Sequence, residues 1–283
     1  MEVKKIKPDK LLELKNDLVF QELFGNPKNN QITSHLLSLI LKREVYKIDL
    51  DVNKRMLRNS PNLKIGRLDI RAKFNDGEEC NIELQVKPHK NMENRMLEYW
   101  AQMYGNKIHR GQKYEVLKPT ISILITDYNL DKTKDISRYH TIWNLREEQQ
   151  QDMKLTNDIE MHILEIPKVK NTELENDELA QWLKFIDSPE SEEVKMLMCE
   201  NKYWKQAIEE LEYLSEEPDF QRLVESRAGF LMDQDFEMDE RERKGKNEAK
   251  TEIAKKMKNK NMPIEEIVEL TGLTKEEVEK LEK

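Results

Sequence analysis

Apolar and polar residues along the first part of the chain follow helical spacing and then strand spacing. Residues 10–24 carry an apolar stripe that ends at a glycine, and residues 32–41 repeat the helical pattern. Residues 45–52 alternate in a way that is typical of a strand. The pattern therefore predicts two helices followed by a strand.

The most regular alternation lies in residues 67–87. Two runs with a period of two flank residues 75–77, Asn-Asp-Gly, and this arrangement predicts a β-hairpin. If Gly77 takes the left-handed position of a three-residue loop, Phe74 pairs with Glu78. A two-residue loop would turn charge against the core on one strand, so the hydrophobic pattern selects the longer loop.

The register of this hairpin brings two carboxylates together. Counting back from the loop, Ile70 meets Ile82 and Asp69 meets Glu83. Carboxylates that face each other across a ladder lie roughly 5 Å apart at Cβ and are destabilising as a bare pair. We therefore expect a positive charge between Asp69 and Glu83.

Two sources of that charge are open at this point. A hard divalent cation such as Mg²⁺, held by one or two carboxylates and completed by waters and substrate phosphate, would remove the repulsion. Alternatively, Arg67, Arg71 and Lys73 neutralise the acids on a solvated polar face of the hairpin.

Later segments complete an α/β pattern. Residues 92–112 predict a long helix with its methionines toward the core, and residues 120–126 predict a central strand covered on both faces. Residues 159–166 repeat the strand signal. Strands interleaved with helices predict an α/β fold with a mixed central sheet flanked by helices.

From residue 172 onward the pattern is helical and contains no catalytic or ligand-binding motif. Residues 236–248 are heavily charged and predict a linker or an exposed helix. Residues 249–283 have helix-turn-helix spacing. Their last helix is rich in glutamate, which would face phosphate badly, so we expect a protein contact or a dimer there rather than DNA reading.

The chain of 283 residues is long enough for a sizeable core and an appendage. We expect an α/β domain over residues 1–170, a helical extension over residues 171–245 and a small helix-turn-helix-like tail over residues 246–283. The two last parts form an all-α C-terminal extension.

Charge is spread unevenly along the chain. The net charge is −8, yet residues 1–120 carry 23 basic and 16 acidic residues, whereas the remainder carries 25 basic and 40 acidic residues. A phosphate-bearing substrate fits the basic part that holds the hairpin. The alternative is uneven surface charge without a partner.

The cysteines and the apolar runs indicate neither a cysteine metal site nor a membrane segment. Cys80 and Cys199 have unrelated contexts and no metal spacing, so we expect both to serve packing. No run approaches the length of a membrane span, and the lysine-rich start lacks an apolar signal core. These patterns favour a cytoplasmic protein without a membrane segment.

The arrangement of the hairpin, after a strand and before a helix that contains an arginine, resembles the PD-(D/E)XK nuclease superfamily. It resembles most closely the transposase-like, recombination-promoting branch. Order and spacing carry this resemblance rather than one specific motif. The matching pieces are Asn16-Asp17-x-x-Phe20, Leu23-Phe24-Gly25, Leu68-Asp69-Ile70, Asp76-Gly77, Asn81-Ile82-Glu83-Leu84-Gln85, Arg95, Tyr99, Gly111-x-x-Tyr114, Pro119 and Thr271-Gly272-Leu273-Thr274.

The resemblance implies a restriction-endonuclease-like core in which Asp69 and Glu83 hold Mg²⁺, with Mn²⁺ as a possible substitute. A metal-bound water would then attack a DNA phosphodiester. Gln85 stands where the superfamily usually has lysine, and its amide can orient water by hydrogen bonds but supplies no charge. Lys87, on the same face, either replaces that charge or is a solvated residue at the strand end.

Asp17 has two interpretations. Aspartate is a common helix N-cap, whereas the resemblance implies a third acid that reaches toward the hairpin from the first helix, with Glu22 as the fallback. Arg95 and Tyr99 share one face of the long helix, and we expect them to contact the phosphates.

The sequence thus leads to the hypothesis of a Mg²⁺-dependent DNA endonuclease of the recombination-promoting kind, dimeric through its C-terminal helices. An alternative is a nuclease-fold protein that has lost cleavage and acts in binding or regulation. A third hypothesis is that the acidic tail blocks the basic cleft.

Overall fold

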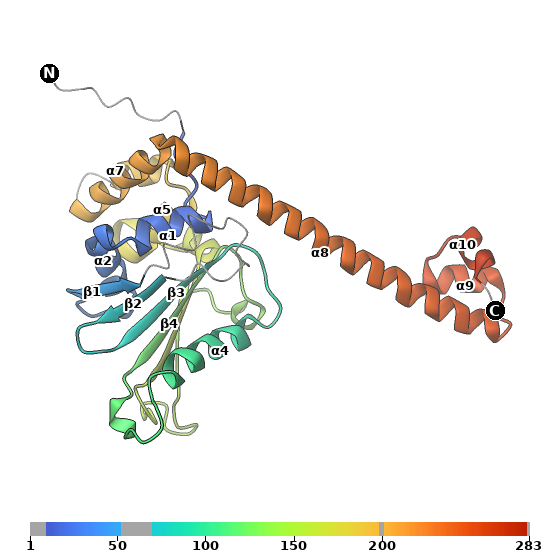
Figure 1. Ribbon diagram of the computed structural model, residues 1–283, viewed down its shortest axis with the longest axis horizontal. Coiled ribbons are helices and arrows are strands. Elements are labelled where there is room, and N and C mark those ends of the chain that lie inside the picture. The colour runs from blue at the N-terminus through green and yellow to red at the C-terminus, as the bar shows by residue number, and fades with distance from the viewer. Residues whose placement is uncertain (1–9, 52–69, 198–200, 282–283) are drawn as a thin grey trace. The chain divides into compact units, whose positions relative to one another are not determined.

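The computed structural model describes residues 10–51, 70–197 and 201–281. The chain divides into two compact units, residues 1–227 and residues 228–283. The first unit contains a β-sheet with helices on both faces (Figure 1).

In the described part of the chain, six strands form one mixed sheet in the order β1-β2-β3-β4-β6-β5. β3, β4 and β6 are parallel, and the other pairs are antiparallel. The mixed central sheet predicted from the sequence is confirmed, but β5 was not predicted. The strands are β1 (Ile48–Asp51), β2 (Ile70–Phe74), β3 (Glu79–Gln85), β4 (Thr120–Thr126), β5 (His140–Asn144) and β6 (Ile159–Glu165).

The predicted hairpin register is confirmed as far as the described residues extend. Ile70 pairs with Ile82, and the Phe74 amide donates to the Glu78 carbonyl at 2.9 Å. Gly77 has a φ of +88°, the left-handed conformation that the three-residue loop requires. Asp69 lies outside the described residues, so its pairing with Glu83 stays a prediction.

The Gly77→Ala variant is expected to lose about 1–2 kcal/mol of unfolding free energy, because an L-residue pays this cost at positive φ. Its new Cβ would also lie 3.3 Å from Cγ of Lys118. Urea unfolding followed by circular dichroism measures the loss. Gly105→Ala is the control, because a Cβ there meets nothing within 4 Å, and an equal loss in both variants would contradict the assignment.

Helices cover the two faces of the sheet differently. α1, α2 and α5 lie on one face and α4 on the other (Figure 1). Among the described residues, the α-helices of the first unit are α1 (Asp17–Gly25), α2 (Asn30–Leu41), α4 (Met92–Gly105), α5 (Glu178–Asp187), α6 (Glu192–Leu197), α7 (Lys202–Glu216) and the first turns of α8 (Pro218–Asn259).

The helix predicted over residues 92–112 is shorter than expected, because α4 ends at Gly105. Glycine and the Asn106 that follows have low helix propensity. The Lys107 side chain then donates to Oγ1 of Thr120 at 2.8 Å, and Gly111 has a φ of +90°. The chain therefore turns back to β4 about two turns earlier than the pattern indicated.

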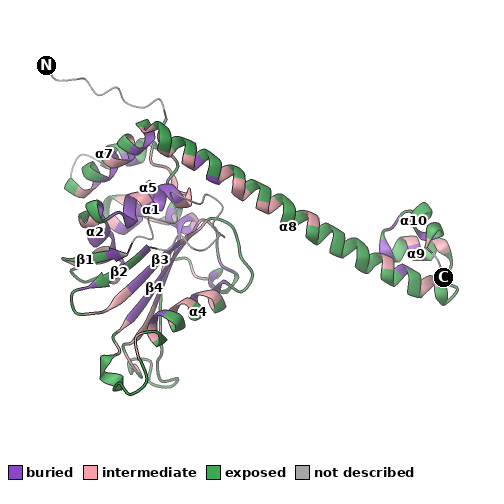
Figure 2. Ribbon diagram, in the orientation of Figure 1, coloured by how far each residue is buried: buried purple, intermediate pink, exposed green. Residues whose placement is uncertain are grey.

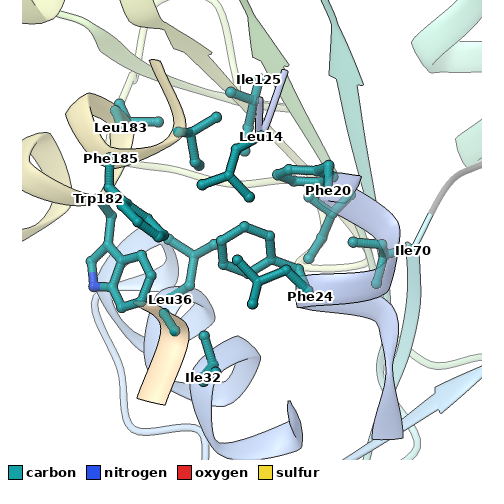
Figure 3. Packing of buried hydrophobic residues seen from close by; sticks show 14 of the residues in the cluster. Leu14, Phe20, Phe24, Ile32, Leu36, Ile70, Ile125, Trp182, Leu183 and Phe185 are labelled. Carbon is teal, nitrogen blue, oxygen red and sulfur yellow. The ribbon is translucent and has the colours of Figure 1, made fainter. Parts of the chain in front are cut away.

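The main core lies between the sheet and α1, α2, α5 and α7. Figure 3 shows Phe20 and Phe24 of α1 packed between the strands and the Trp182 region of α5. The ring centroids of Trp182 and Trp204 lie 4.6 Å apart in a stacked arrangement. Helices on both sides of residue 170 thus share one core. Cys80 is also completely buried in it, which agrees with a packing role, whereas Cys199 lies outside the described residues.

A second, smaller core lies under α4. Met92 and Met96 are buried there against residues of β4 and β6, among them Leu124 and Met161, so the predicted orientation of the methionines is confirmed. Figure 2 shows the buried inner strands beside the exposed outer side of α4. α4 thus shields this side of β3 and β4, including its polar side chains, from water.

The second unit contains the rest of α8 with α9 (Ile264–Thr271) and α10 (Lys275–Lys280). Residues 236–248 belong to the continuous helix α8, so the exposed-helix interpretation is right and the linker interpretation is wrong. Thr274 and Glu277 form the capping box of α10. Ala254, Ile267 and Val278 are completely buried in the core of this unit. In the described part of the chain, no helix combines the length and the apolarity needed to cross a membrane.

Candidate functional site

Glu83 is a buried acid in the third strand of the sheet. Successive side chains of a strand point to opposite faces, and Ile82 faces the main core while Glu83 faces α4. The Glu83 side chain is 6% exposed. The polar face of β3 around Asn81 and Glu83 is therefore covered, so the solvated interpretation is wrong for β3, although Arg71 and Lys73 on β2 are exposed.

Arg95 of α4 supplies the positive charge beside this acid. Its Nη2 lies 2.6 Å from Oε1 of Glu83, and its own side chain is 15% exposed. Arg71 and Lys73, the neutralising residues considered from sequence, are exposed, and Arg67 lies outside the described residues. The sequence placed Arg95 on a polar face of the helix but did not indicate that it pairs with Glu83.

Tyr99 lies one helical turn beyond Arg95 and contacts the same guanidinium. Nε of Arg95 donates to the Tyr99 hydroxyl at 3.2 Å, and the guanidinium carbon lies 5.3 Å from the centroid of the Tyr99 ring. Both contacts restrict the orientation of the arginine. The structure therefore brings together three of the residues selected from sequence: Glu83, Arg95 and Tyr99.

Tyr128 is a neighbour of this group that sequence reasoning missed. Burial raises the pKa of the Tyr128 phenol above its usual value, and the negative charge of Glu83 acts in the same direction. Tyr128 follows β4, which runs parallel to β3 with Thr126 beside Gln85. The sequence did contain a signal for Tyr128, because ligands bind near the carboxyl ends of parallel strands and Tyr128 lies just past such a strand.

Gln85 and Lys87 lie at the carboxyl end of β3. Nε2 of Gln85 donates to the backbone carbonyl of Lys87 at 3.0 Å, and the Gln85 carbonyl accepts from the Asp127 amide at 3.1 Å. Gln85 is partly buried, whereas Lys87 is exposed. The Gln85 amide is thus oriented by the backbone just past the end of its own strand.

Asp17 contacts a different arginine. Asn16 is the N-cap of α1, because its Oδ1 accepts from the Leu18 amide at 3.0 Å, so the interpretation of Asp17 as the cap is wrong. Oδ2 of Asp17 lies 2.7 Å from Nη2 and 3.1 Å from Nε of Arg227. Arg227 is 1% exposed. The fallback acid, Glu22, accepts from Nδ2 of Asn26 at 2.6 Å.

A chain of titratable side chains lies apart from Glu83, at the β5 edge of the sheet. Nε2 of His140 lies 2.9 Å from Nδ1 of His162, whose Nε2 lies 3.0 Å from Oε1 of Glu160. Burial, with the charge of His162 in second place, lowers the pKa of His140 to about 4. His140 therefore contributes to the pH dependence of stability.

We expect the protein to lose stability as the pH falls from 6.5 toward 4, because in this window the unfolded chain protonates His140 while the folded protein keeps it neutral. Unfolding free energies measured by urea titration across this range test the expectation. His140→Gln should show a shallower loss on acidification than the wild type, and identical slopes for the two proteins would contradict it.

The Glu83 carboxylate can serve as one oxygen ligand of a hard divalent cation. A carboxylate is the oxygen ligand that Mg²⁺ prefers, and one or two carboxylates suffice when waters and phosphate complete the shell. Glu83 offers such a donor in a covered position. Within the described ranges no three His, Cys, Asp or Glu side chains gather into a metal-binding group, and the predicted second ligand, Asp69, lies outside these ranges.

The first unit combines a mixed sheet, covered by helices on both faces, with a buried carboxylate on an inner strand beside a helix arginine. This arrangement is consistent with a nuclease-like α/β fold. The family model described as PD-(D/E)XK nuclease family transposase matches residues 14–241, and the chain belongs to this family. The resemblance and the fold class predicted from sequence are thereby confirmed. No curated protein matches the chain, and no solved structure matches it either.

Membership of this family carries a nuclease-type, hydrolytic function and implies DNA as the substrate. Nucleases of this kind usually use divalent metal ions.

Proposed function

We propose that this protein is a Mg²⁺-dependent DNA endonuclease of the recombination-promoting, transposase-like kind that acts in the cytoplasm. The observation that carries the proposal is the covered Glu83 carboxylate, with Arg95 2.6 Å from it on the helix that follows. A buried acid that only served stability would be costly to maintain. A metal-dependent nuclease needs such an acid.

Glu83, together with Asp69, would hold the cation, for which Mn²⁺ is a possible substitute. When bound, Mg²⁺ supplies Lewis acidity at the phosphate and lowers the pKa of water. Gln85 would position the attacking water, because its amide is fixed by the Lys87 carbonyl.

The cationic residues would bind the DNA backbone. Arg95 would bind a phosphate through its guanidinium, which Tyr99 orients. Lys87 is exposed at the end of β3 and would add a point charge near the same phosphate. Asp17 would assist from α1, where Arg227 fixes its carboxylate.

A dimer through the C-terminal helices is part of the proposal. Leu270 of α9 and Ile253 of α8 are 60% and 49% exposed in the second unit. Such apolar side chains on a small helical unit are candidates for contact with a second copy. Analytical ultracentrifugation of the full chain and of its Leu270→Glu, Ile253→Glu variant would show whether these positions support association.

A second function, that of an inactive nuclease-fold binding protein, is favoured by one observation. Glutamine stands at position 85, and its amide nitrogen donates to the protein backbone. A cleavage assay on plasmid DNA with Mg²⁺, with Mn²⁺ and with a chelator, combined with calorimetric titration of both metals, separates the two functions. The endonuclease predicts metal binding and metal-dependent cutting, whereas binding of DNA without either result would support the alternative.

A further inference from the structure

The pair formed by Arg95 and Glu83 suggests how metal binding is controlled in this protein. We propose that Arg95 competes with the divalent cation for Glu83 and so keeps the metal affinity low until DNA is present. This inference rests on the proposed function, because it concerns the same cation.

The competition follows from distances. Nη2 of Arg95 lies 2.6 Å from Oε1 of Glu83, and Mg²⁺ binds carboxylate oxygen at about 2.1 Å. A cation on this oxygen would therefore lie within about 5 Å of the guanidinium nitrogen. Like charges at such a separation repel strongly where water is largely excluded, and both side chains are covered.

Arg95 cannot avoid the conflict by losing its charge, because arginine stays protonated in proteins. The cation must therefore displace the guanidinium from Oε1 or bind against its repulsion.

Tyr99 keeps the displaced guanidinium close to the site. Its hydroxyl accepts from Nε of Arg95, and its ring lies beside the guanidinium carbon. The Tyr99 hydroxyl accepts from Nε, whereas Glu83 faces Nη2, so the two contacts use different donors of the guanidinium. Once Glu83 releases Nη2, a DNA phosphate can accept from this nitrogen.

This arrangement couples the two ligands. Phosphate draws Arg95 away from Glu83 and favours the cation, and the cation frees Arg95 for phosphate. By linkage, each ligand should raise the affinity for the other by the same factor.

Calorimetric titration of the full chain with Mn²⁺ in the absence of DNA tests the proposal. Arg95→Gln is expected to bind Mn²⁺ at least tenfold more tightly than the wild type, which corresponds to about 1.4 kcal/mol. DNA cleavage by Arg95→Gln should nevertheless fall, because the variant lacks the guanidinium that would bind the DNA phosphate. Arg110→Gln, which removes an equal charge from an exposed position after α4, is the matched control and should bind Mn²⁺ as the wild type does.

Arg95→Met, which keeps much of the apolar stem, replaces Arg95→Gln if the latter melts below the assay temperature. Equal or weaker Mn²⁺ affinity in the Arg95 variant would overturn the proposal while leaving the nuclease function intact. Detectable Mn²⁺ binding by the Arg95 variant, but not by the wild type, would support the proposal. Absence of Mn²⁺ binding in every protein would overturn the metal-dependent function and this inference together.

Discussion

DNA cleavage by the Glu83→Gln variant is expected to fall at least about a thousandfold, because the variant lacks the carboxylate that would hold the metal. A thousandfold change corresponds to about 4 kcal/mol of transition-state stabilisation, within the several kcal/mol that a metal ion supplies. Glutamine has nearly the shape of glutamate but lacks its negative charge. Single-turnover cleavage of duplex DNA with Mg²⁺ measures the effect.

The matched control for this variant lies on the same strand. Glu79 of β3 is partly buried, and its Oε2 lies 3.6 Å from Nζ of Lys107. Glu79→Gln therefore removes one carboxylate beside one cation, as Glu83→Gln does, but away from Arg95. It should cut DNA within about threefold of the wild-type rate, whereas equal losses in both variants would indicate a general effect of the strand.

The second large effect is expected in stability. Asp17→Asn should lower the unfolding free energy by roughly 2–4 kcal/mol, because it removes the carboxylate that compensates the buried Arg227 guanidinium. The figure lies below the full cost of breaking a buried pair, since the Asp17 side chain is 26% exposed. Urea unfolding monitored by tryptophan fluorescence reports on the first unit.

An exposed pair provides the comparison for Asp17. Oδ1 of Asp219 lies 3.2 Å from Nη1 of Arg222, and both side chains are more than three-quarters exposed. Asp219→Asn should therefore change stability by less than about 0.5 kcal/mol. If Asp17→Asn costs no more than this control, Asp17 does not anchor Arg227 in solution.

The hairpin was predictable because two local signals agree on its register. Strand alternation places Ile70 opposite Ile82, and Gly77 provides the positive φ of the loop. β4 was predictable from its continuous apolar run, since a parallel strand covered on both faces needs apolar residues throughout. β5 lacks this signature because it lies at the sheet edge, where Ile142 and Trp143 are 42% and 45% exposed.

The partners of the two acids could not be read from the sequence, because both contacts are tertiary. Arg95 follows Glu83 by only twelve positions, yet the pairing depends on how α4 covers the sheet. Arg227 is 210 positions from Asp17, and no local pattern connects them. The chain divides into its two compact units after residue 227, and the domain boundaries near residues 170 and 245 stay a prediction.

The most direct test of the central claim is nicking of supercoiled plasmid DNA by the wild type and by Glu83→Gln, at equal concentration and with Mg²⁺. The proposed function predicts nicked and linear products from the wild type, none after chelation of the metal, and none from the variant. Cutting by Glu83→Gln at the wild-type rate, with an unchanged circular dichroism spectrum, would contradict the assignment of Glu83 as the metal-binding acid.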